Sequence, residues 1–190
     1  MSFDLIIVVI GLIVLFGAYG TYVSVIQAKN KVQEAASGID VQLKKRYDLI
    51  PNMLKIAKSF MEHEKEIFTK ITELRTQALK LSDNLSDMNE KIELDKQIRS
   101  EMKKFMVSVE NYPALKSDGA MISAMNAYAD TEEHIAAARR FYNSAVLILN
   151  NKVEIFPSSI IAGMLGIKKQ EFFQAEEAER KSIDANEFLR

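Results

Sequence analysis

The 190-residue sequence contains no cysteine and no tryptophan, and it has only seven glycines and three prolines. The absence of cysteine excludes disulfide bonds, thiolate zinc sites and cysteine nucleophiles. The formal net charge is −1, so the chain lacks the strongly basic field that attracts nucleic acid, and we expect no nucleic-acid partner. Because helix-breaking residues are scarce and Ala, Leu, Ile, Glu, Lys and Met are abundant, the composition favours long helices.

Catalytic and metal-binding motifs are also missing from the sequence. The two histidines, His63 and His134, do not belong to the Glu-x-x-His pattern of di-iron helical bundles, because Phe60 and Thr131 stand three positions before them. A zinc-protease motif starting at His63 fails because Ile67 occupies the place of its second histidine. The sequence has neither a glycine-rich phosphate loop nor a Gly-x-Ser-x-Gly motif. We therefore expect no enzyme activity, no cofactor and no bound metal.

One long apolar run lies near the N-terminus. Leu5–Ile26 carries no charged side chain, and a helix of about 20 apolar residues crosses the hydrocarbon core of a bilayer. A cleavable signal peptide is the alternative, suggested by the small residues Ala18 and Gly20, but no lysine or arginine precedes the run and it continues past that point. We predict a permanent anchor over residues 1–27, with the lipid bilayer as its partner. Its representative membrane-spanning residues are Leu5, Ile10, Leu15, Tyr19, Tyr22 and Ile26.

Charges on either side of this run predict its orientation. Asp4 is the only charged side chain before the run, whereas Lys29, Lys31 and the cluster at 44–46 follow it. Positively charged flanks stay in the cytoplasm. We therefore expect a single-pass protein of the cell membrane with its N-terminus outside and its C-terminal domain in the cytoplasm.

The chain after the anchor has the pattern of amphipathic helices. Apolar residues recur at alternating spacings of three and four from Val32 to Leu81, close to the 3.5-residue period of coiled coils. Pro51 interrupts this stripe without changing its phase, so we expect a helix kink at Pro51 rather than a helix end.

Two further stripes complete the predicted architecture. The second occupies residues 88–109 and ends before Pro113, and the third occupies residues 121–153, with Ser117 or Asp118 as its cap. Short connections between long helices predict antiparallel neighbours. The expected fold class is all-α: an N-terminal transmembrane helix that runs into a long-helix antiparallel bundle, with three long helices plus a short C-terminal helical segment.

This architecture divides the chain into three parts. Residues 1–27 form the transmembrane anchor, residues 28–167 form the antiparallel helical bundle, and residues 168–190 form a polar C-terminal helical tail.

Charged residues on the third stripe predict a polar layer inside the bundle. Glu132 and Arg139 lie one heptad apart among apolar residues, and buried charges must be paired. We expect both to meet polar residues of the first helix. Alternatively, Ala136 and Ala138 face inward and the two charges point outward. The predicted layer consists of Asp40, Arg46, Asn52, Glu132 and Arg139.

A short apolar segment follows Pro157. Its apolar side chains, which we call the C-terminal apolar patch, are Phe156, Ile160, Ile161, Met164 and Leu165. With three helices running up, down and up from the membrane, this patch would lie at the membrane-distal end of the bundle. An exposed apolar group there would be an oligomer or partner contact. The alternative is a cap folded over the open end of the bundle.

Four sequence blocks resemble those of a known family. NKVQEAASGIDVQLKKRYDLIPNM, ENYPALKSD, TEEHIAAARRFYN and FPSSIIAGMLGIKKQEFF are similar to the signature blocks of the LemA family of bacterial membrane proteins. The resemblance implies a single N-terminal span and a cytoplasmic antiparallel helical bundle. Members of the family are similar to a protein required for magnetosome formation, which points to membrane organisation. The resemblance implies no particular catalytic activity.

These features together predict a scaffold. We expect a membrane-anchored, homo-oligomeric helical scaffold or adaptor that organises the membrane or other membrane proteins. The alternative is a regulatory or sensor subunit that couples the membrane to a separate enzyme partner through the kink at Pro51.

Overall fold

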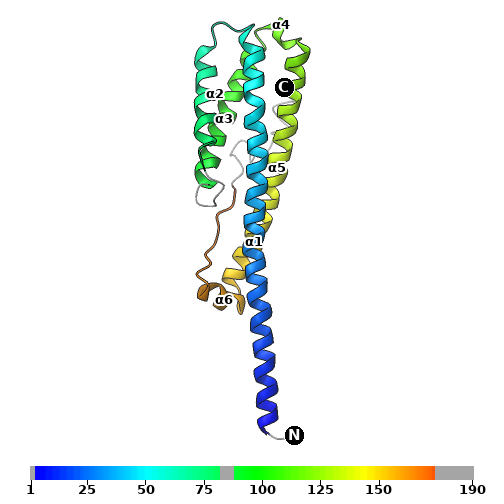
Figure 1. Cartoon of the computed structure of the whole chain (residues 1–190), viewed down its shortest axis with the longest axis vertical. Helices are drawn as coiled ribbons and strands as arrows, with labels where there is room; N and C mark the ends of the chain where they lie inside the picture. Colours follow the sequence, from blue (N-terminus) through cyan, green and yellow to red (C-terminus); the bar gives the residue numbers. More distant parts are fainter. Residues whose placement is uncertain (1–2, 82–87, 174–190) are drawn as a thin grey trace, which may run out of the picture.

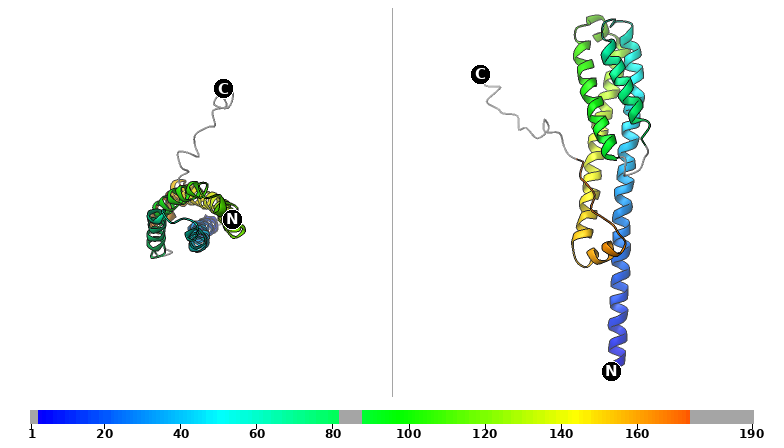
Figure 2. Two further views of the ribbon diagram at one scale, coloured as in Figure 1. Left: turned by 90° about the horizontal axis from the view of Figure 1, so that it is seen from above. Right: turned by 90° about the vertical axis from the view of Figure 1, so that its left-hand side faces the viewer.

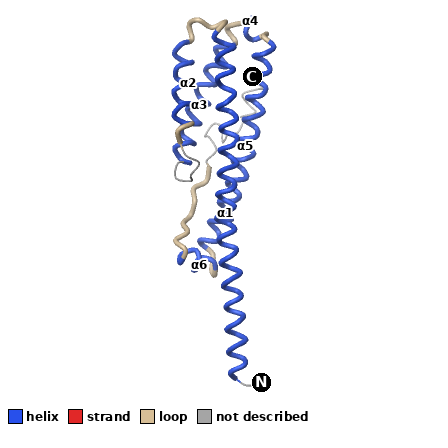
Figure 3. The backbone as a smooth tube through the Cα atoms, in the orientation of Figure 1, coloured by secondary structure: helices blue, strands red, loops and turns tan. Residues whose placement is uncertain are grey.

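The computed structural model describes residues 3–81 and 88–173, and within these residues it has six helices and no strand, so the all-α class is confirmed (Figure 3). The helices are α1 (Phe3–Lys58), α2 (Lys65–Ala78), α3 (Met88–Val109), α4 (Pro113–Lys116), α5 (Gly119–Glu154) and α6 (Ser158–Met164).

The long helices pass up and down beside α1. Starting from the N-terminal end, α1 rises, α2 returns, α3 rises again and α5 descends along α1 (Figure 1). Seen along the long axis, α2, α3 and α5 form an arc with α1 on its inner side (Figure 2). The bundle therefore encloses only the upper part of α1, while its N-terminal part extends beyond the bundle.

The helix that we expected to continue to Leu81 ends instead at Lys58, which corrects the prediction. The chain turns over residues 59–64 and reverses into α2. Inside this turn Met61 is buried, and its N–H donates to the carbonyl of Ala57 at 2.9 Å. The apolar stripe keeps its phase across the reversal: Ala57 before it, Met61 within it and Ile71 after it are all buried in the core. The chain consequently makes one more pass than the sequence predicts.

Apolar side chains from each long helix build the core. The fully buried ones include Ile39, Leu43, Ile50 and Met53 of α1, Ile71 of α2, Ile98, Met102 and Phe105 of α3, and Met121, Ile135 and Val146 of α5. The rings of Phe68 and Phe105 meet with their centroids 6.0 Å apart, which joins α2 to α3. The spacing of these residues is the one that the sequence stripes predict.

Two local predictions concern helix ends. Asp118 caps α5, because its carboxylate accepts a hydrogen bond from the N–H of Met121 at 2.9 Å. Pro51 lies inside α1 and does not end it, as expected; the kink itself stays a prediction. Residues 168–173 are not helical, which corrects the expected helical tail for these positions; the rest of that tail lies outside the described residues.

The N-terminal part of α1 has the properties of a membrane span. Within the described chain, α1 is the single unbroken helix that is long and apolar enough to cross a membrane, and its apolar window is completely exposed in the protein. Leu5, Ile10, Leu15, Tyr19 and Tyr22 are all exposed. Ile26 is partly covered. The exposed apolar length is therefore available to lipid, and protein contacts begin near its end.

Candidate functional site

A cluster of charged side chains around the buried Arg46 and Asp95 joins three helices of the bundle. Arg46 of α1 is fully buried and forms salt bridges with Asp95 of α3 and, at 2.5 Å, with Glu132 of α5. Asp95 is also fully buried, and it accepts a hydrogen bond from Nη2 of Arg139 on α5 at 3.0 Å. We call these four residues the buried ion cluster: Arg46, Asp95, Glu132 and Arg139.

The cluster matches the predicted polar layer in part. Arg46 and Glu132 meet as expected, and Arg139 lies in the same layer. Asp40 is elsewhere, in a salt bridge with Lys91 of α3, and Asn52 is exposed on α1. The layer is thus built by two helices in addition to α1, rather than by α1 and α5 alone.

The central acceptor, Asp95, was missed by the sequence reasoning. The apolar stripe of α3 includes Ile92 and Ile98 but leaves a gap between them. Asp95 fills the middle of that gap with a spacing of three on each side, which places its carboxylate on the core face. The gap was the available signal, because a charge at a core position requires a buried partner.

Two tyrosines border the cluster. The hydroxyl of Tyr47 donates to Oδ1 of Asp95 at 3.5 Å, and the guanidinium of Arg46 lies 5.9 Å from the Tyr47 ring centre. Burial, opposed in part by the charge of Arg46, raises the pKa of Tyr47 to about 12. Burial likewise raises the pKa of Tyr128 above its ordinary range. Both hydroxyls therefore keep their protons to a higher pH than an exposed tyrosine does.

The buried ion cluster lacks the parts of a reaction centre. Its guanidinium and carboxylate groups are paired with one another, and Arg99 of α3 adds a further contact to Asp95 at 3.7 Å. Within this set no nucleophile lies beside a base. In the ranges 3–81 and 88–173, no group of three or more His, Cys, Asp or Glu residues could hold a metal ion. Paired charges of this kind fix how helices align along their lengths, so the arrangement supports a structural role.

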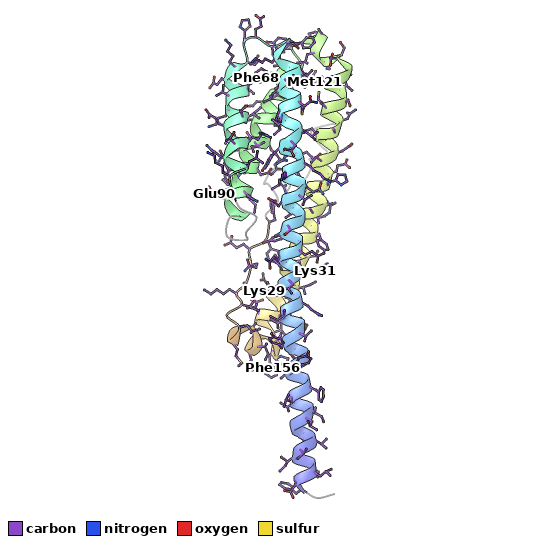
Figure 4. The ribbon with its side chains drawn as sticks, viewed as in Figure 1. Lys29, Lys31, Phe68, Glu90, Met121 and Phe156 are labelled. Carbon is purple, nitrogen blue, oxygen red and sulfur yellow. The ribbon has the colours of Figure 1, made fainter. Side chains whose placement is uncertain are left out.

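The C-terminal apolar patch lies at the opposite end of the bundle from the one expected. Because α5 descends along α1, α6 is placed beside the lower part of α1, below the level of Lys29 (Figure 4). Phe156, Ile160 and Met164 are 74%, 56% and 80% exposed, Leu165 is exposed, and Ile161 is half-buried. The membrane-distal location is therefore wrong, and the missed turn between α1 and α2 is the reason.

Local interactions hold α6 in this place. Its Ser158 and Ala162 are buried, and α6 packs against α1. At its end Gly166 adopts a left-handed φ of 64°, and Ile167 N–H donates to the carbonyl of Ala162 at 3.0 Å. This pattern closes the helix with a glycine cap. The covered side of α6 thus faces the protein, and the patch faces away from it.

The chain then returns along α5 in an extended form. Asn143 exchanges two hydrogen bonds with the backbone of Phe173, at 2.9 and 2.8 Å. Asn150, one heptad further along α5, does the same with Gln170 at 2.9 Å for each bond. The guanidinium of Arg139 lies 4.4 Å from the Phe173 ring centre. The return segment therefore connects the region of α6 to the buried ion cluster.

Two grooves accompany these features. One of about 590 Å³ lies between α1 and α2, where Pro51, Leu54 and Phe68 provide apolar lining and Lys55 and Arg75 provide charge.

The second groove, of about 300 Å³, lies beside α6. It is lined by Lys29 and Val32 of α1, Leu149 of α5, and Leu165 and Lys168 of the segment that follows α6. It thus combines apolar walls with two basic side chains.

Comparisons with known proteins identify the family of this chain. A family model described as "LemA family" matches residues 35–186. Protein LemA of Metamycoplasma hominis is 30% identical over 159 residues, which cover 84% of this chain and 71% of that protein. Magnetosome protein MamQ 1 and Magnetosome protein MamQ 2 of Paramagnetospirillum magneticum are each 22% identical over 182 residues. This chain spans 66% of the length of each magnetosome protein.

Proposed function

This chain belongs to the LemA family, and on that basis we propose that it is a self-associating, membrane-anchored scaffold or adaptor that organises the membrane or other membrane proteins. Its N-terminal helix anchors it, and its helical bundle presents outward faces to partners. The magnetosome proteins among its relatives support a role in membrane organisation.

The continuity of α1 carries this proposal. One helix runs without a break from the apolar span to the top of the bundle at Lys58, which lies about 55 Å beyond Gly20 at 1.5 Å per residue. The buried ion cluster fixes α3 and α5 to this rod. A rigid bundle held at a set height above a bilayer is suited to position other molecules.

An exposed apolar strip on α5 supports self-association. Phe141 and Ile148 are one heptad apart and are 46% and 51% exposed, and Leu147 beside them is also exposed. Apolar residues at heptad spacing on an open helix face pack well against a second helix. Several anchors in one assembly would hold the membrane much more firmly than one, because binding of the second anchor becomes intramolecular.

Light scattering by the full-length protein in mild detergent tests this proposal. We expect a defined assembly of several copies. The double variant Phe141→Ser/Ile148→Ser should reduce the mass to that of the monomer with unchanged helical content. Val107→Ser on α3 is the matched control, because Val107 is exposed on a different face and its replacement should leave the assembly intact. A wild-type protein that is monomeric at all concentrations would contradict self-association.

A second candidate function is favoured by the groove beside Pro51. A regulatory or sensor subunit would bind a separate enzyme partner, and the apolar floor and basic rim of this groove suit an acidic amphipathic segment. Cross-linking from Lys55→Cys in cells distinguishes the two functions. Capture of one enzyme in a constant ratio to this chain would favour the regulatory subunit, whereas copy-to-copy products alone would favour the scaffold.

A further inference from the structure

The height of α6 relative to the membrane span can be stated from α1 alone. Residues of α1 from Phe3 to Gly20 are exposed in the protein, and partial cover begins at Thr21, with Val25 fully buried. Because α6 packs against α1, it lies near the end of the exposed span. At 1.5 Å per residue, Val25 is only about 7 Å beyond Gly20, which is comparable with the thickness of one interfacial region of a bilayer.

The direction of α6 fits this height. The chain bends by 93° between α5 and α6, and α5 runs along α1 (Figure 2). The axis of α6 is therefore roughly perpendicular to the axis of the span. A helix with this orientation lies parallel to the plane of a membrane that α1 crosses.

The side chains of α6 divide according to this geometry. Ser158 and Ala162 are buried against the protein, whereas Phe156, Ile160 and Met164 are exposed. Helices that lie in a bilayer surface bury one apolar face in the boundary between head groups and acyl chains. Exposure of the C-terminal apolar patch to water is unfavourable. An exposed apolar group of this kind marks a contact surface.

Basic side chains lie next to the patch on the side of the bundle. Lys29 and Lys168 line the same groove as Leu165, and Figure 4 shows Lys29 above Phe156 along the rod. Lysines immediately beyond a membrane span interact with anionic head groups over a distance of about one Debye length. Apolar groups below and lysines above reproduce the polarity gradient of a lipid surface.

We propose that α6 is a second membrane contact: the C-terminal apolar patch inserts into the surface of the same bilayer that α1 spans, and Lys29 and Lys168 bind the phosphate groups of anionic lipids. This inference rests on the anchoring of α1, which the proposed function also requires, and it is independent of self-association. A bundle attached at two points cannot swing about its span, so the rod is held at a fixed tilt.

Depth measurements on the full-length chain test this proposal, and the absence of native cysteine allows single labels. Ile160→Cys and Met164→Cys carry an environment-sensitive fluorophore in phosphatidylcholine vesicles. Leu12→Cys in the span and Asn126→Cys on the exposed face of α5 are the references. We expect a spin label near the lipid head group to quench positions 160 and 164 several-fold more than position 126. Equal quenching at positions 160, 164 and 126, with position 12 strongly quenched by a second spin label placed deep in the acyl chains, would overturn the insertion.

Two further outcomes have a defined meaning. Labels at 160 and 164 that are shielded from a water-soluble quencher but not quenched by lipid would assign the patch to a copy-to-copy contact and overturn the proposal.

Adding phosphatidylglycerol should increase the lipid quenching in the wild-type background, and Lys29→Gln/Lys168→Gln should abolish this increase. An unchanged response in that variant would overturn the role of the lysines. Light scattering on the same variants in mild detergent reports self-association separately, so failure of one idea does not imply failure of the other.

Discussion

Arg46 is surrounded by groups from three helices, and its charge is balanced within the protein. It reaches Asp95 and Glu132, while Arg139 and Arg99 supply two further positive charges to Asp95. Transferring such charges from water is costly, and their mutual attraction compensates only while every partner is present. Loss of one member is therefore more damaging than the net contribution of the intact cluster suggests.

Removing Arg46 tests this reasoning. Arg46→Met keeps much of the side-chain volume but removes the arginine paired with Glu132 and one of those paired with Asp95, and we expect a loss of about 3–5 kcal/mol in the free energy of unfolding. Lys44→Met is the control, because Lys44 is exposed on the same helix and its replacement should change stability by less than about 0.5 kcal/mol. Chemical unfolding in mild detergent, followed by circular dichroism, measures both. Similar stability of the two variants would show that the cluster is not energetically coupled.

The tyrosines beside the cluster predict an alkaline loss of stability. The pKa of Tyr47 rises from 10.0 in the unfolded chain to about 12 in the folded protein. The folded state thus keeps the phenolic proton of Tyr47 to a higher pH than the unfolded chain does. The resulting contribution to the free energy of unfolding is complete below pH 10 and is lost as the pH rises towards 12. A shift of two units corresponds to about 2–3 kcal/mol.

Tyr47→Phe should remove this part of the pH dependence. The difference in unfolding free energy between wild type and variant should be constant below pH 10 and should change above it, with the wild type losing more. Unfolding curves at several pH values measure this difference. A constant difference up to pH 12 would contradict the assigned pKa.

At the scale of helices, the sequence predicts which face of a helix is buried better than it predicts where the helix ends. The stripes identify most of the buried residues of α1, α3 and α5, although they omit Met53 and Tyr47, because the period of the apolar residues shows which side of a helix meets the core. The period of the apolar residues does not show whether the chain continues as one helix. Ala57, Met61 and Ile71 stay in phase although the chain reverses between α1 and α2. The turn contains neither glycine nor proline, so the usual signals of a helix end are absent.

The same limit applies to the candidate site. Glu132 could be expected to meet a polar residue of the first helix because it lies on an apolar stripe, and Arg46 was one of the candidates. Asp95 became evident only once α3 was placed beside α1 and α5. The location of the C-terminal apolar patch depends on the number of passes, which is a property of the whole bundle. A single missed turn reversed its position relative to the membrane.

A helix end that has a capping residue in the sequence should contribute measurably to the free energy of unfolding. Asp118 accepts a hydrogen bond from Met121 N–H at the start of α5, and we expect Asp118→Ala to lower the free energy of unfolding by about 1 kcal/mol. Asp118→Asn keeps the acceptor oxygen and should cost only a small part of this amount. Thermal melts of the three proteins test the cap. Equal melting temperatures for the alanine and asparagine variants would show that the hydrogen bond is not responsible.

The molecule as a whole is polar along its axis. Helices α1, α2, α3 and α5 alternate in direction, so the even number of passes returns the chain to the end of the bundle from which the span emerges (Figure 1). That end gathers Lys29, Lys31, Lys168 and Lys169, of which Lys31 and Lys169 are paired with Glu34 and Glu154, while Asp4 is the charge at the opposite end of the span. The fold therefore increases the charge asymmetry that the sequence shows around the span alone.

This asymmetry predicts the orientation in the cell membrane. Because positively charged flanks stay in the cytoplasm, the bundle should be cytoplasmic and the N-terminus external. A membrane-impermeant maleimide applied to intact cells should label Phe3→Cys but should label Asn126→Cys only after the membrane is disrupted. The wild-type chain, which has no cysteine, provides the background. Labelling of Asn126→Cys in intact cells would place the bundle outside and would show that the lysines beside α6 do not determine the topology.

Replacing Lys29 and Lys31 by glutamate should weaken the preference for a cytoplasmic bundle, because it removes the positive charges nearest to the span. A mixed labelling pattern would be the direct sign of this effect.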